Sequence, residues 1–362
     1  MLSLRMLPAK EGDALWITWG STAEPHRMLV DMGTEAVGKK VRARILNLPE
    51  AQRKLDLVVV THVDRDHIGG VLTCLAEADE IPGLDIADVW FNGYTHLTGG
   101  KVTSTLEPMG AAQGERLSAW LRKQRWNKAF DGGQCVRTQP LKTVTLHDDL
   151  KLTVIGSTAA KLASFVDDWE DEVHEALKKG SLTAGQVTPG LEAMGTEQKP
   201  ELETKADLHD LADSTTTDDT AKANGSSISL LLEYQGKSVV LAGDAHSEDL
   251  IDGLEATRGG GRAAIDAFKL PHHASKSNVT RALVDKVTCP CWLVSTDGTR
   301  FKHPDAIAIA RLLAYGQPKS PLLAFNARSK YSGWWDDPDW KQLFDYQTAY
   351  GSEADGYELL YN

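Results

Sequence analysis

One short stretch, from Leu57 to Gly70, constrains both the fold and the chemistry of this chain most strongly. It reads Leu-Val-Val-Val-Thr-His-Val-Asp-Arg-Asp-His-Ile-Gly-Gly, so four apolar residues lead directly into two histidines and two aspartates. A continuous and mostly β-branched run of this kind is typical of a strand that is buried on both faces. The polar residues therefore follow the carboxyl end of that strand, where α/β folds commonly place their ligand sites.

The polar side chains of this stretch are potential metal ligands. They are His62, Asp64, Asp66 and His67. Zinc, manganese and iron ions accept such a mixed set of nitrogen and oxygen ligands. The alternative is a strand end followed by a polar turn that holds unrelated histidines. Four potential ligands packed this tightly after a buried strand favour the metal site.

Length and composition favour a large globular protein. The chain has 362 residues, of which 41% are hydrophobic, and this is enough for a large core. No apolar run approaches the ~20 residues of a membrane span, and the N-terminus lacks the features of a signal peptide. The pair Cys289 and Cys291 lacks the second pair that a zinc site needs, and no disulfide framework is apparent. We therefore expect a cytoplasmic protein that has no membrane partner.

The charge of the chain limits its partners. The formal net charge is −12, and an acidic chain is not a general binder of nucleic acid. This counts against a nuclease without sequence preference, unless a local basic site overrides the overall charge.

Alternating strand and helix patterns predict an α/β protein. Strands are expected at 4–7, 14–19, 27–31, 57–60, 89–93, twice within 141–157, and at 227–233, 237–242, 265–270 and 291–295. Helices are expected at 38–54, 71–79, 105–128, 160–179 and 305–314. Hairpins combined with strand–helix units fit two mixed sheets with outer helices.

The domain organisation follows from changes in composition. We expect one domain over residues 1–320, interrupted by an insertion at about 160–223. Within the insertion, residues 201–220 hold seven acidic residues and one lysine, so this part is expected to be mobile. Residues 321–362 are rich in aromatic side chains and are expected to form an extension that packs on the domain.

The histidine and aspartate cluster resembles the metallo-β-lactamase superfamily signature His-x-His-x-Asp-His, with Asp64 in place of the second histidine. In its longer form it is similar to the hydrolase domain of ComEC-type DNA-uptake proteins. Further motifs similar to that group follow in the same order, namely Gly12-Asp13-Ala14, Val30-Asp31-Met32-Gly33, Asn224 to Leu231, Leu241 to Asp244, Lys269 to Ser275, and His303-Pro304. The resemblance covers about residues 1–315 without the insertion, and it implies an α/β fold of the metallo-β-lactamase type, an αββα sandwich.

The resemblance also implies a site for one or two divalent ions, Zn²⁺ or Mn²⁺. The candidate ligands are His62, Asp64, Asp66, His67, Asp244, His273 and His303. One ion would be held by the first two residues. The other would be held by Asp66, His67 and one histidine of the pair His272–His273, and Asp244 would bridge the ions. The turn at Asp31 is expected to abut the site.

Catalysis would use a bridging hydroxide as the nucleophile. The candidate catalytic residues are Asp66, His272 and His273, because the histidine that does not bind metal can protonate the leaving group. Asp64 makes the ligand set harder and shifts its preference towards Mn²⁺ or Mg²⁺ beside Zn²⁺. No third-motif histidine is evident between residues 68 and 243, so the first ion is expected to be weakly held or absent.

Three readings of the activity remain open. The leading one is a metal-dependent phosphodiesterase or nuclease, acting on a small-molecule or nucleic-acid phosphodiester. Cations near the motifs would bind the phosphate, and they are Arg65, Lys276 and Lys302, with Lys269 and Arg300 as further candidates. The alternative for these cations is an ordinary place on the surface. The other two readings are hydrolysis of a lactone, lactam or thioester, and a metal-binding or partner-binding protein with little turnover.

Overall fold

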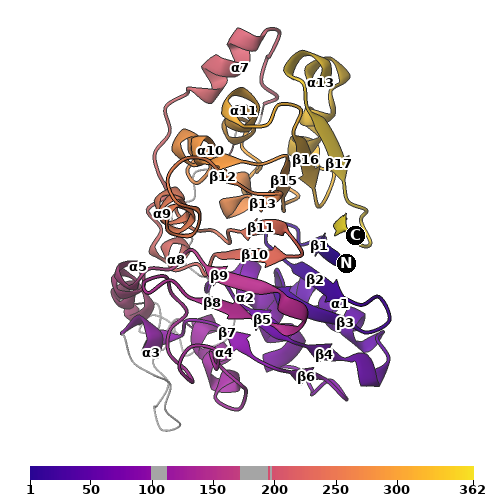
Figure 1. Cartoon of the computed structure of the whole chain (residues 1–362), viewed down its shortest axis with the longest axis vertical. Coiled ribbons are helices and arrows are strands. Elements are labelled where there is room, and N and C mark those ends of the chain that lie inside the picture. Colours follow the sequence, from indigo (N-terminus) through magenta and orange to yellow (C-terminus); the bar gives the residue numbers. More distant parts are fainter. Residues whose placement is uncertain (99–111, 172–194, 196–197) are drawn as a thin grey trace.

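Two mixed β-sheets face each other in the computed structural model, which describes residues 1–98, 112–171, 195 and 198–362 (Figure 1). The first sheet has the strand order β18-β1-β2-β3-β5-β7. Its strands are β1 (Leu2–Met6), β2 (Leu15–Gly20), β3 (Pro25–Val30), β5 (Leu57–Val59), β7 (Val89–Trp90) and β18 (Tyr357–Tyr361). Strands β3, β5 and β7 run parallel, whereas the hairpin side of the sheet is antiparallel.

The second sheet has the order β17-β16-β15-β13-β11-β10-β9-β8. Its strands are β8 (Thr143–Thr145), β9 (Lys151–Val154), β10 (Leu230–Tyr234), β11 (Lys237–Leu241), β13 (Ala267–Lys269), β15 (Cys291–Val294), β16 (Leu322–Phe325) and β17 (Gln347–Tyr350). The strands from β11 to β17 are parallel, and the hairpins β8–β9 and β10–β11 complete the sheet.

Apolar side chains fill the space between the sheets and cover their outer faces. Between the sheets, Ile17 and Val59 of the first sheet pack in one cluster with Leu230 and Leu241 of the second. A second cluster joins the outer face of the first sheet to helices α1 (Glu35–Leu46), α2 (Arg65–Val71), α4 (Ala112–Leu121) and α5 (Ala159–Ser164). A third joins the second sheet to helices α7 (Lys205–Ala212), α9 (Ser247–Arg258), α10 (Arg281–Lys286), α11 (Ala306–Tyr315) and α13 (Pro338–Phe344). The predicted fold class, an αββα sandwich of two mixed sheets with outer helices, is confirmed.

Short elements complete the chain. They are β4 (Lys54–Leu55), β6 (Asp85–Ile86), β12 (Ala263–Ala264), β14 (Val287–Thr288), α3 (Tyr94–Leu97), α8 (Lys222–Gly225), α12 (Lys330–Gly333) and the single turns η1 (Glu50–Gln52), η2 (Leu72–Ala76), η3 (His147–Asp149), η4 (Pro271–Ala274) and η5 (Trp334–Asp336). None of the helices in the described part of the chain is long and apolar enough to cross a bilayer.

The expected helices differ from the observed ones mainly at their ends. The helix expected at 38–54 ends at Leu46, because Pro49 disfavours helical backbone at the residue before it. The helix expected at 71–79 begins earlier, at Arg65, and is continued by η2. Parts of two expected helices, at 105–111 and 172–179, lie outside the described residues.

The acidic part of the expected insertion differs from the sequence-based expectation of mobility. Leu208 and Ala212 of α7 are buried in the same cluster as α11, and Leu202 joins them. The buried guanidinium of Arg311 donates hydrogen bonds to the carbonyl oxygens of Ala212 and Ser214. Asp210 is exposed on a helix whose Leu208 and Ala212 are buried, so composition alone did not reveal the packing.

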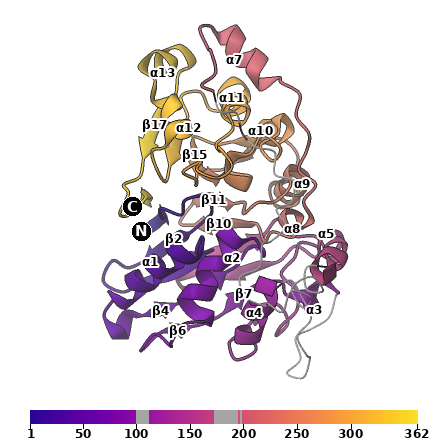
Figure 2. The ribbon, with the colours of Figure 1, turned by 180° about the vertical axis from the view of Figure 1, so that it is seen from behind.

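Residues 321–362 also play a larger part than an extension packed on the domain. They supply β16 and β17 to the second sheet and β18 to the first. Strand β18 pairs with β1, so Tyr361 lies opposite Leu2, and Figure 2 shows the two ends of the chain side by side. Both sheets are therefore completed by residues 321–362, about the last eighth of the sequence.

Candidate metal centre

The site forms where strands from both sheets end. The turn after β5 leads into α2, the turn after β11 carries Asp244, and η4 follows β13. Because β11 and β13 are parallel neighbours, their carboxyl ends lie at the same edge of the sheet. The loop between β1 and β2 also reaches the site at Gly12. A Cβ atom at this position would lie 1.7 Å from the carbonyl oxygen of Asp66, so only glycine allows the two backbones to come this close. Segments that are far apart in sequence thus meet at one point.

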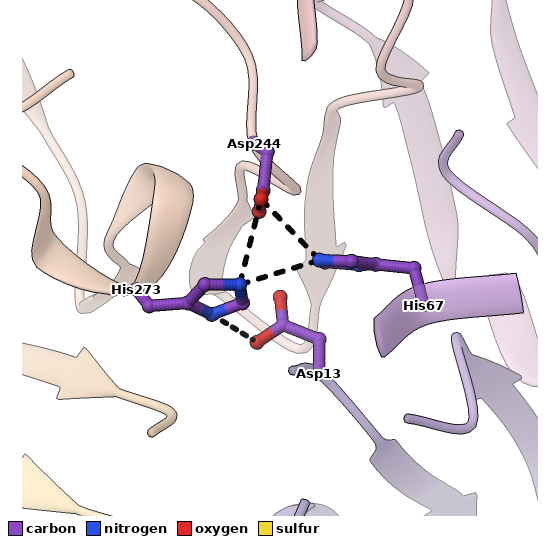
Figure 3. Close-up of side chains that lie close together, drawn as sticks. All are labelled: Asp13, His67, Asp244 and His273. Atoms are coloured by element: carbon purple, nitrogen blue, oxygen red, sulfur yellow. Dashed lines mark hydrogen bonds and ion pairs between the residues drawn. The ribbon is translucent and has the colours of Figure 1, made fainter. Parts of the chain in front are cut away.

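Four side chains, Asp66, His67, Asp244 and His273, form a compact group that we call the tetrad. The Nε2 atom of His67 lies 3.3 Å from Asp244 Oδ2 and 3.4 Å from His273 Nε2. The latter nitrogen lies 3.4 Å from Asp244 Oδ2 and 3.4 Å from Asp66 Oδ2. In Figure 3, His67, His273 and Asp244 point toward one another. An ion with tetrahedral bonds of about 2.0–2.1 Å has ligand–ligand edges of about 3.3–3.4 Å, so these four contacts match edges of the coordination shell of such an ion. Asp13 also offers a ligand atom within 4.8 Å of those of His67, Asp244 and His273.

Hydrogen bonds fix the tautomers of the two tetrad histidines. The Nδ1 atom of His67 lies 2.7 Å from Asp31 Oδ2, and that of His273 lies 3.0 Å from the carbonyl oxygen of Ser295. Both partners accept, so each Nδ1 donates. The Nε2 lone pairs then face the centre of the tetrad, which is the usual arrangement of histidines that bind metal.

His62 is held in the same way, one residue beyond the strand. The hydroxyl of Thr61 donates to Asp31 Oδ2 at 2.7 Å, so it accepts a hydrogen bond from His62 Nδ1 at 2.9 Å. The Nε2 atom of His62 is buried and has no hydrogen-bond partner in the described part of the chain. A buried imidazole nitrogen without a partner is costly, and a metal ion would satisfy it.

His62, together with Asp64 and His272, forms a second and looser group that we call the outer set. His62 Nε2 lies 3.6 Å from Asp64 Oδ2 and 3.9 Å from Asp244 Oδ2. His272 Nε2 lies 4.0 Å from the same Asp244 oxygen. Asp244 therefore stands between the tetrad and the outer set, where the sequence predicted a bridging carboxylate.

The charges of the tetrad support each other. Burial opposes ionisation, but the neighbouring histidines hold the pKa of Asp244 well below its ordinary value, and they lower that of Asp66. Burial likewise opposes the protonation of His67 and His273, but Asp244 and the other carboxylates raise the pKa of both imidazoles well above the ordinary value. Without metal, protons thus occupy the positions that a cation would take.

Asp13 reaches the site although the sequence gave it no role beyond its motif. Its carboxylate lies 3.5 Å from His273 Nδ1 and pairs with the fully buried Lys269, and it offers a ligand atom within 4.8 Å of those of His67, His273 and Asp244 (Figure 3). Burial would raise the pKa of Asp13, but Lys269 and His273 lower it to about 2. Asp13 therefore supports His273 and is also a candidate ligand that the sequence analysis missed. Lys269, a further candidate for phosphate binding in the sequence, forms this buried ion pair instead.

His303 lies beside the outer set. Its ring packs edge-on against His272, with ring centroids 5.8 Å apart, and its Nδ1 lies 3.5 Å from Asp305 Oδ2. Burial and the neighbouring histidines lower the pKa of His303 well below the ordinary value, so this imidazole is neutral. Of the site histidines, His303 therefore packs against His272.

The three predicted substrate-binding cations flank the site to different degrees. Arg65 is half exposed at the start of α2 and pairs with Glu35 at 2.8 Å. Lys276 is mostly buried, and its Nζ lies 3.7 Å from Asp305 Oδ1. Lys302 directly precedes His303 in the chain and has a positive φ of 63°. Of the other candidates, Arg300 stacks on Phe301, with its Cζ 4.8 Å from the ring centroid.

The paired histidines lie on an unusual turn. His272, His273 and Ala274 have φ values of 46°, 54° and 66°, so three successive residues occupy the left-handed region. Each such residue costs about 1–2 kcal/mol unless it is glycine. Hydrogen bonds from His272 N to the Gly243 carbonyl oxygen and from Asp305 N to that of Ala274 brace the turn. This backbone splays the two rings, so that His273 enters the tetrad and His272 enters the outer set.

A second group of possible ligands is occupied by a cation of the chain itself. His246, Glu248 and Asp249 lie close together at the start of α9. Lys161 Nζ sits among them, 2.9 Å from His246 Nδ1 and 2.6 Å from Glu248 Oε1. This group is therefore an ion-pair network.

Comparison with known proteins adds little to this description. No family model and no curated protein matches the chain. Among solved structures, a Parabacteroides distasonis protein described as a metal-dependent hydrolase is similar over 96% of this chain and 92% of its own, with 12% identity and a TM-score of 0.38. The metallo-β-lactamase fold protein YhfI from Bacillus subtilis covers 99% of this chain and 100% of its own, with 10% identity and a TM-score of 0.38. A Cronobacter sakazakii metallo-β-lactamase with a HARLDQ motif is similar over 74% of this chain and 76% of its own, with 13% identity and a TM-score of 0.32. These values are too low to assign a family or an activity.

Proposed function

We propose that the protein is a metal-dependent hydrolase that cleaves phosphodiesters. The observation that carries the proposal is the tetrad. In it, His273 Nε2 lies 3.4 Å from His67 Nε2 and 3.4 Å from a carboxylate oxygen of each aspartate, and His67 Nε2 lies 3.3 Å from Asp244 Oδ2. Such a donor set fits zinc or manganese. When bound, a divalent ion supplies Lewis acidity and a water whose pKa is lowered to near neutrality.

The residues around the tetrad have separate tasks in this proposal. Asp31 and Ser295 hold the metal-facing histidines in one tautomer. Asp244 stands between the tetrad and the outer set, where it can contact both. His272 Nε2 lies 4.0 Å from Asp244 Oδ2 and can hold a proton for the leaving oxygen. Burial of the whole group excludes bulk water and strengthens each electrostatic interaction.

Cations beside the site favour an anionic substrate over a lactone, lactam or thioester. A pocket of about 470 Å³ is lined by Lys10, Lys39 and Arg65, together with Thr34, Thr299 and two glutamates. Arg65 directly follows Asp64 in the chain, and Glu11 lies two residues before Asp13, so two residues at the wall of the pocket are sequence neighbours of site residues. Lys10 and Lys39 at its wall suit a phosphate group, and Arg65 would bind two phosphate oxygens in place of its present partner Glu35.

The proposal is tested by metal content and turnover of the full chain. We expect the purified protein, titrated with Zn²⁺ or Mn²⁺, to bind at least one ion and to hydrolyse bis(p-nitrophenyl) phosphate. A panel of lactones, lactams and thioesters is assayed in parallel. Turnover of that panel without turnover of the diester would replace the phosphodiesterase with the second reading, and tight metal binding without any turnover would favour the third.

A matched pair of variants connects the activity to the tetrad. His67→Ala removes a ligand of the tetrad, whereas His147→Gln changes an imidazole that is 71% exposed and lies outside the site. Turnover should be lost only in the first variant. Equal activity of both variants would show that the measured hydrolysis does not come from this centre.

A further inference from the structure

The segment between α7 and α8 brings a buried carboxylate to the outer set. Asp219 has a side chain that is 9% exposed and lies in a stretch without sheet structure. Its Oδ2 accepts hydrogen bonds from Asn224 Nδ2 at 2.8 Å and from Asn278 Nδ2 at 2.9 Å, and its Oδ1 accepts one from Ala221 N. Burial alone would raise the pKa of Asp219, but His272 and the two amides lower it, so the carboxylate is charged.

The side-chain amide of Asn278 can be oriented from its surroundings. One end faces Asp219 Oδ2 at 2.9 Å and the carbonyl oxygens of Ala245 and Asp244 at 3.2 and 3.3 Å. All three groups accept hydrogen bonds, so this end must be the NH₂ group. The opposite end, Oδ1, then faces His272 Nδ1 at 2.9 Å.

The orientation of this amide determines the tautomer of His272. An amide oxygen accepts, so His272 Nδ1 donates and its Nε2 is turned towards Asp244, 4.0 Å away. Asn224 Nδ2 also lies 3.4 Å from His272 Nδ1, but its shorter contact is the one to Asp219. Asp219 Oδ2 itself lies 3.4 Å from His272 Nδ1, so it attracts the same proton directly.

We propose that Asp219 is a positioning residue that fixes the Asn278 amide and thereby holds His272 with a proton on Nδ1 and with Nε2 facing the site. The segment that carries Asp219 would then complete the site from outside the two sheets. Arg311 ties this segment to the loop after the histidines, because its guanidinium donates to the Ser214 and Lys276 carbonyl oxygens. The consequence for turnover, but not the tautomer, rests on the proposed function.

The decisive variant is Asp219→Asn in the full chain. If the asparagine keeps its oxygen towards Ala221 N, its NH₂ group faces the NH₂ group of Asn278, and two donors oppose each other. Turning the Asn278 amide would relieve this contact at the expense of its 3.2 and 3.3 Å bonds to the Ala245 and Asp244 carbonyl oxygens. It would present the NH₂ group to His272 Nδ1, which would favour the tautomer with the proton on Nε2. Asp210→Asn is the matched control, because it removes the same charge from an exposed position on α7.

The measurement is a long-range ¹H–¹⁵N spectrum of protein labelled in its histidine rings, recorded without added metal at alkaline pH, where an imidazole is neutral. The His272 signal is assigned by its loss in His272→Gln. We expect the Nδ1–H tautomer in the wild type and in Asp210→Asn, and a shift to Nε2–H in Asp219→Asn. If Asp219→Asn does not fold, Asp219→Ala is measured instead, and the Nε2–H form should become detectable beside the other. Wild-type tautomers in the folded variant would overturn the proposal.

Kinetics provide the second readout. With the metal-loaded enzyme and bis(p-nitrophenyl) phosphate, Asp219→Asn should lower kcat about 10- to 100-fold, as the loss of a residue that orients a site histidine commonly does. KM and metal content should stay unchanged, and Asp219→Glu should recover part of kcat. A changed KM with unchanged kcat would contradict positioning. If the wild type shows no turnover at all, the phosphodiesterase proposal fails, and the tautomer measurement still decides the role of Asp219.

Discussion

The tetrad and the outer set meet at Asp244, which belongs to the tetrad and lies within 4.0 Å of two histidines of the outer set. They consist of the same kinds of side chain, yet they differ in spacing and in support. Contacts within the tetrad measure 3.3–3.4 Å, whereas those of the outer set measure 3.6–4.0 Å. The carboxylate of Asp64 is 21% exposed, whereas that of Asp66 is 11% exposed and its partner His273 is almost fully buried. The tetrad is already spaced for one ion, and the outer set must contract to hold a second.

Removing one histidine from each group should give the largest difference in metal binding between the tetrad and the outer set. His67→Ala should lower metal affinity and turnover by more than about 100-fold, since loss of a ligand exceeds the 10- to 100-fold cost of losing its support. His62→Ala should retain one ion per chain. Metal titrations followed by calorimetry, with His147→Gln as control, measure both. Equal losses in the two variants would show that the groups act as one site.

The support of the tetrad should matter next. Asp31 accepts hydrogen bonds from His67 Nδ1 and from the Thr61 hydroxyl, so Asp31→Asn disturbs both rings that lead from β5. Metal affinity should fall about 10- to 100-fold. Thr61→Val is the comparison variant, because it removes the hydroxyl that connects Asp31 to His62 but keeps the bond from His67 Nδ1 to Asp31. An equal loss in Thr61→Val would mean that the outer set contributes as much to binding as the tetrad.

A buried histidine without a metal role gives a contrasting pH dependence. The Nδ1 atom of His96 accepts a hydrogen bond from Gly93 N, and its Nε2 donates to the Gly133 carbonyl oxygen, so the neutral ring is satisfied at both nitrogens. Burial lowers the pKa of His96 from 6.5 to about 4. The neutral ring is therefore favoured in the folded state, and its contribution is complete above the unfolded pKa and is lost as the pH falls towards the folded one.

Between pH 7.5 and pH 5, this histidine should cost the wild type about 2 kcal/mol of unfolding free energy. His96→Gln lacks the titrating group, so it should lose less stability over the same interval. Urea unfolding of both proteins at the two pH values measures the difference. An equal loss of unfolding free energy in the two proteins between these pH values would show that His96 is not buried as a neutral ring.

The smallest effect is expected from Asp64→His, which adds an imidazole to the outer set. It removes one negative charge and softens the ligands, so zinc should gain over manganese and the pH–rate profile should shift to lower pH. Activity should change less than about 10-fold, because the tetrad stays intact. Titration with both metals checks this result. An unchanged metal preference would mean that Asp64 is not a ligand.

Much of the centre could be predicted because its residues are adjacent in sequence. His62 to His67 follow one buried strand, and the pair His272–His273 follows another, so their convergence needs only the parallel arrangement of strand ends. The choice of His273 over His272 could not be predicted, since it depends on the left-handed turn. Asp219 and Asn278 were missed because their roles arise from contacts between distant segments, and the acidic surroundings of Asp219 suggested a mobile insertion.

The left-handed turn at His272, His273 and Ala274 also limits how this centre could be moved or redesigned. A peptide of these residues would relax to ordinary backbone angles, because its local bond from Ser275 N to the His272 carbonyl oxygen does not offset three left-handed residues. In the protein, the compensation comes from Gly243 and Asp305, which belong to other loops. A graft of the histidine motif onto another scaffold would therefore lose the divergence of the two rings. A working graft would have to include the turn together with the loops that brace it.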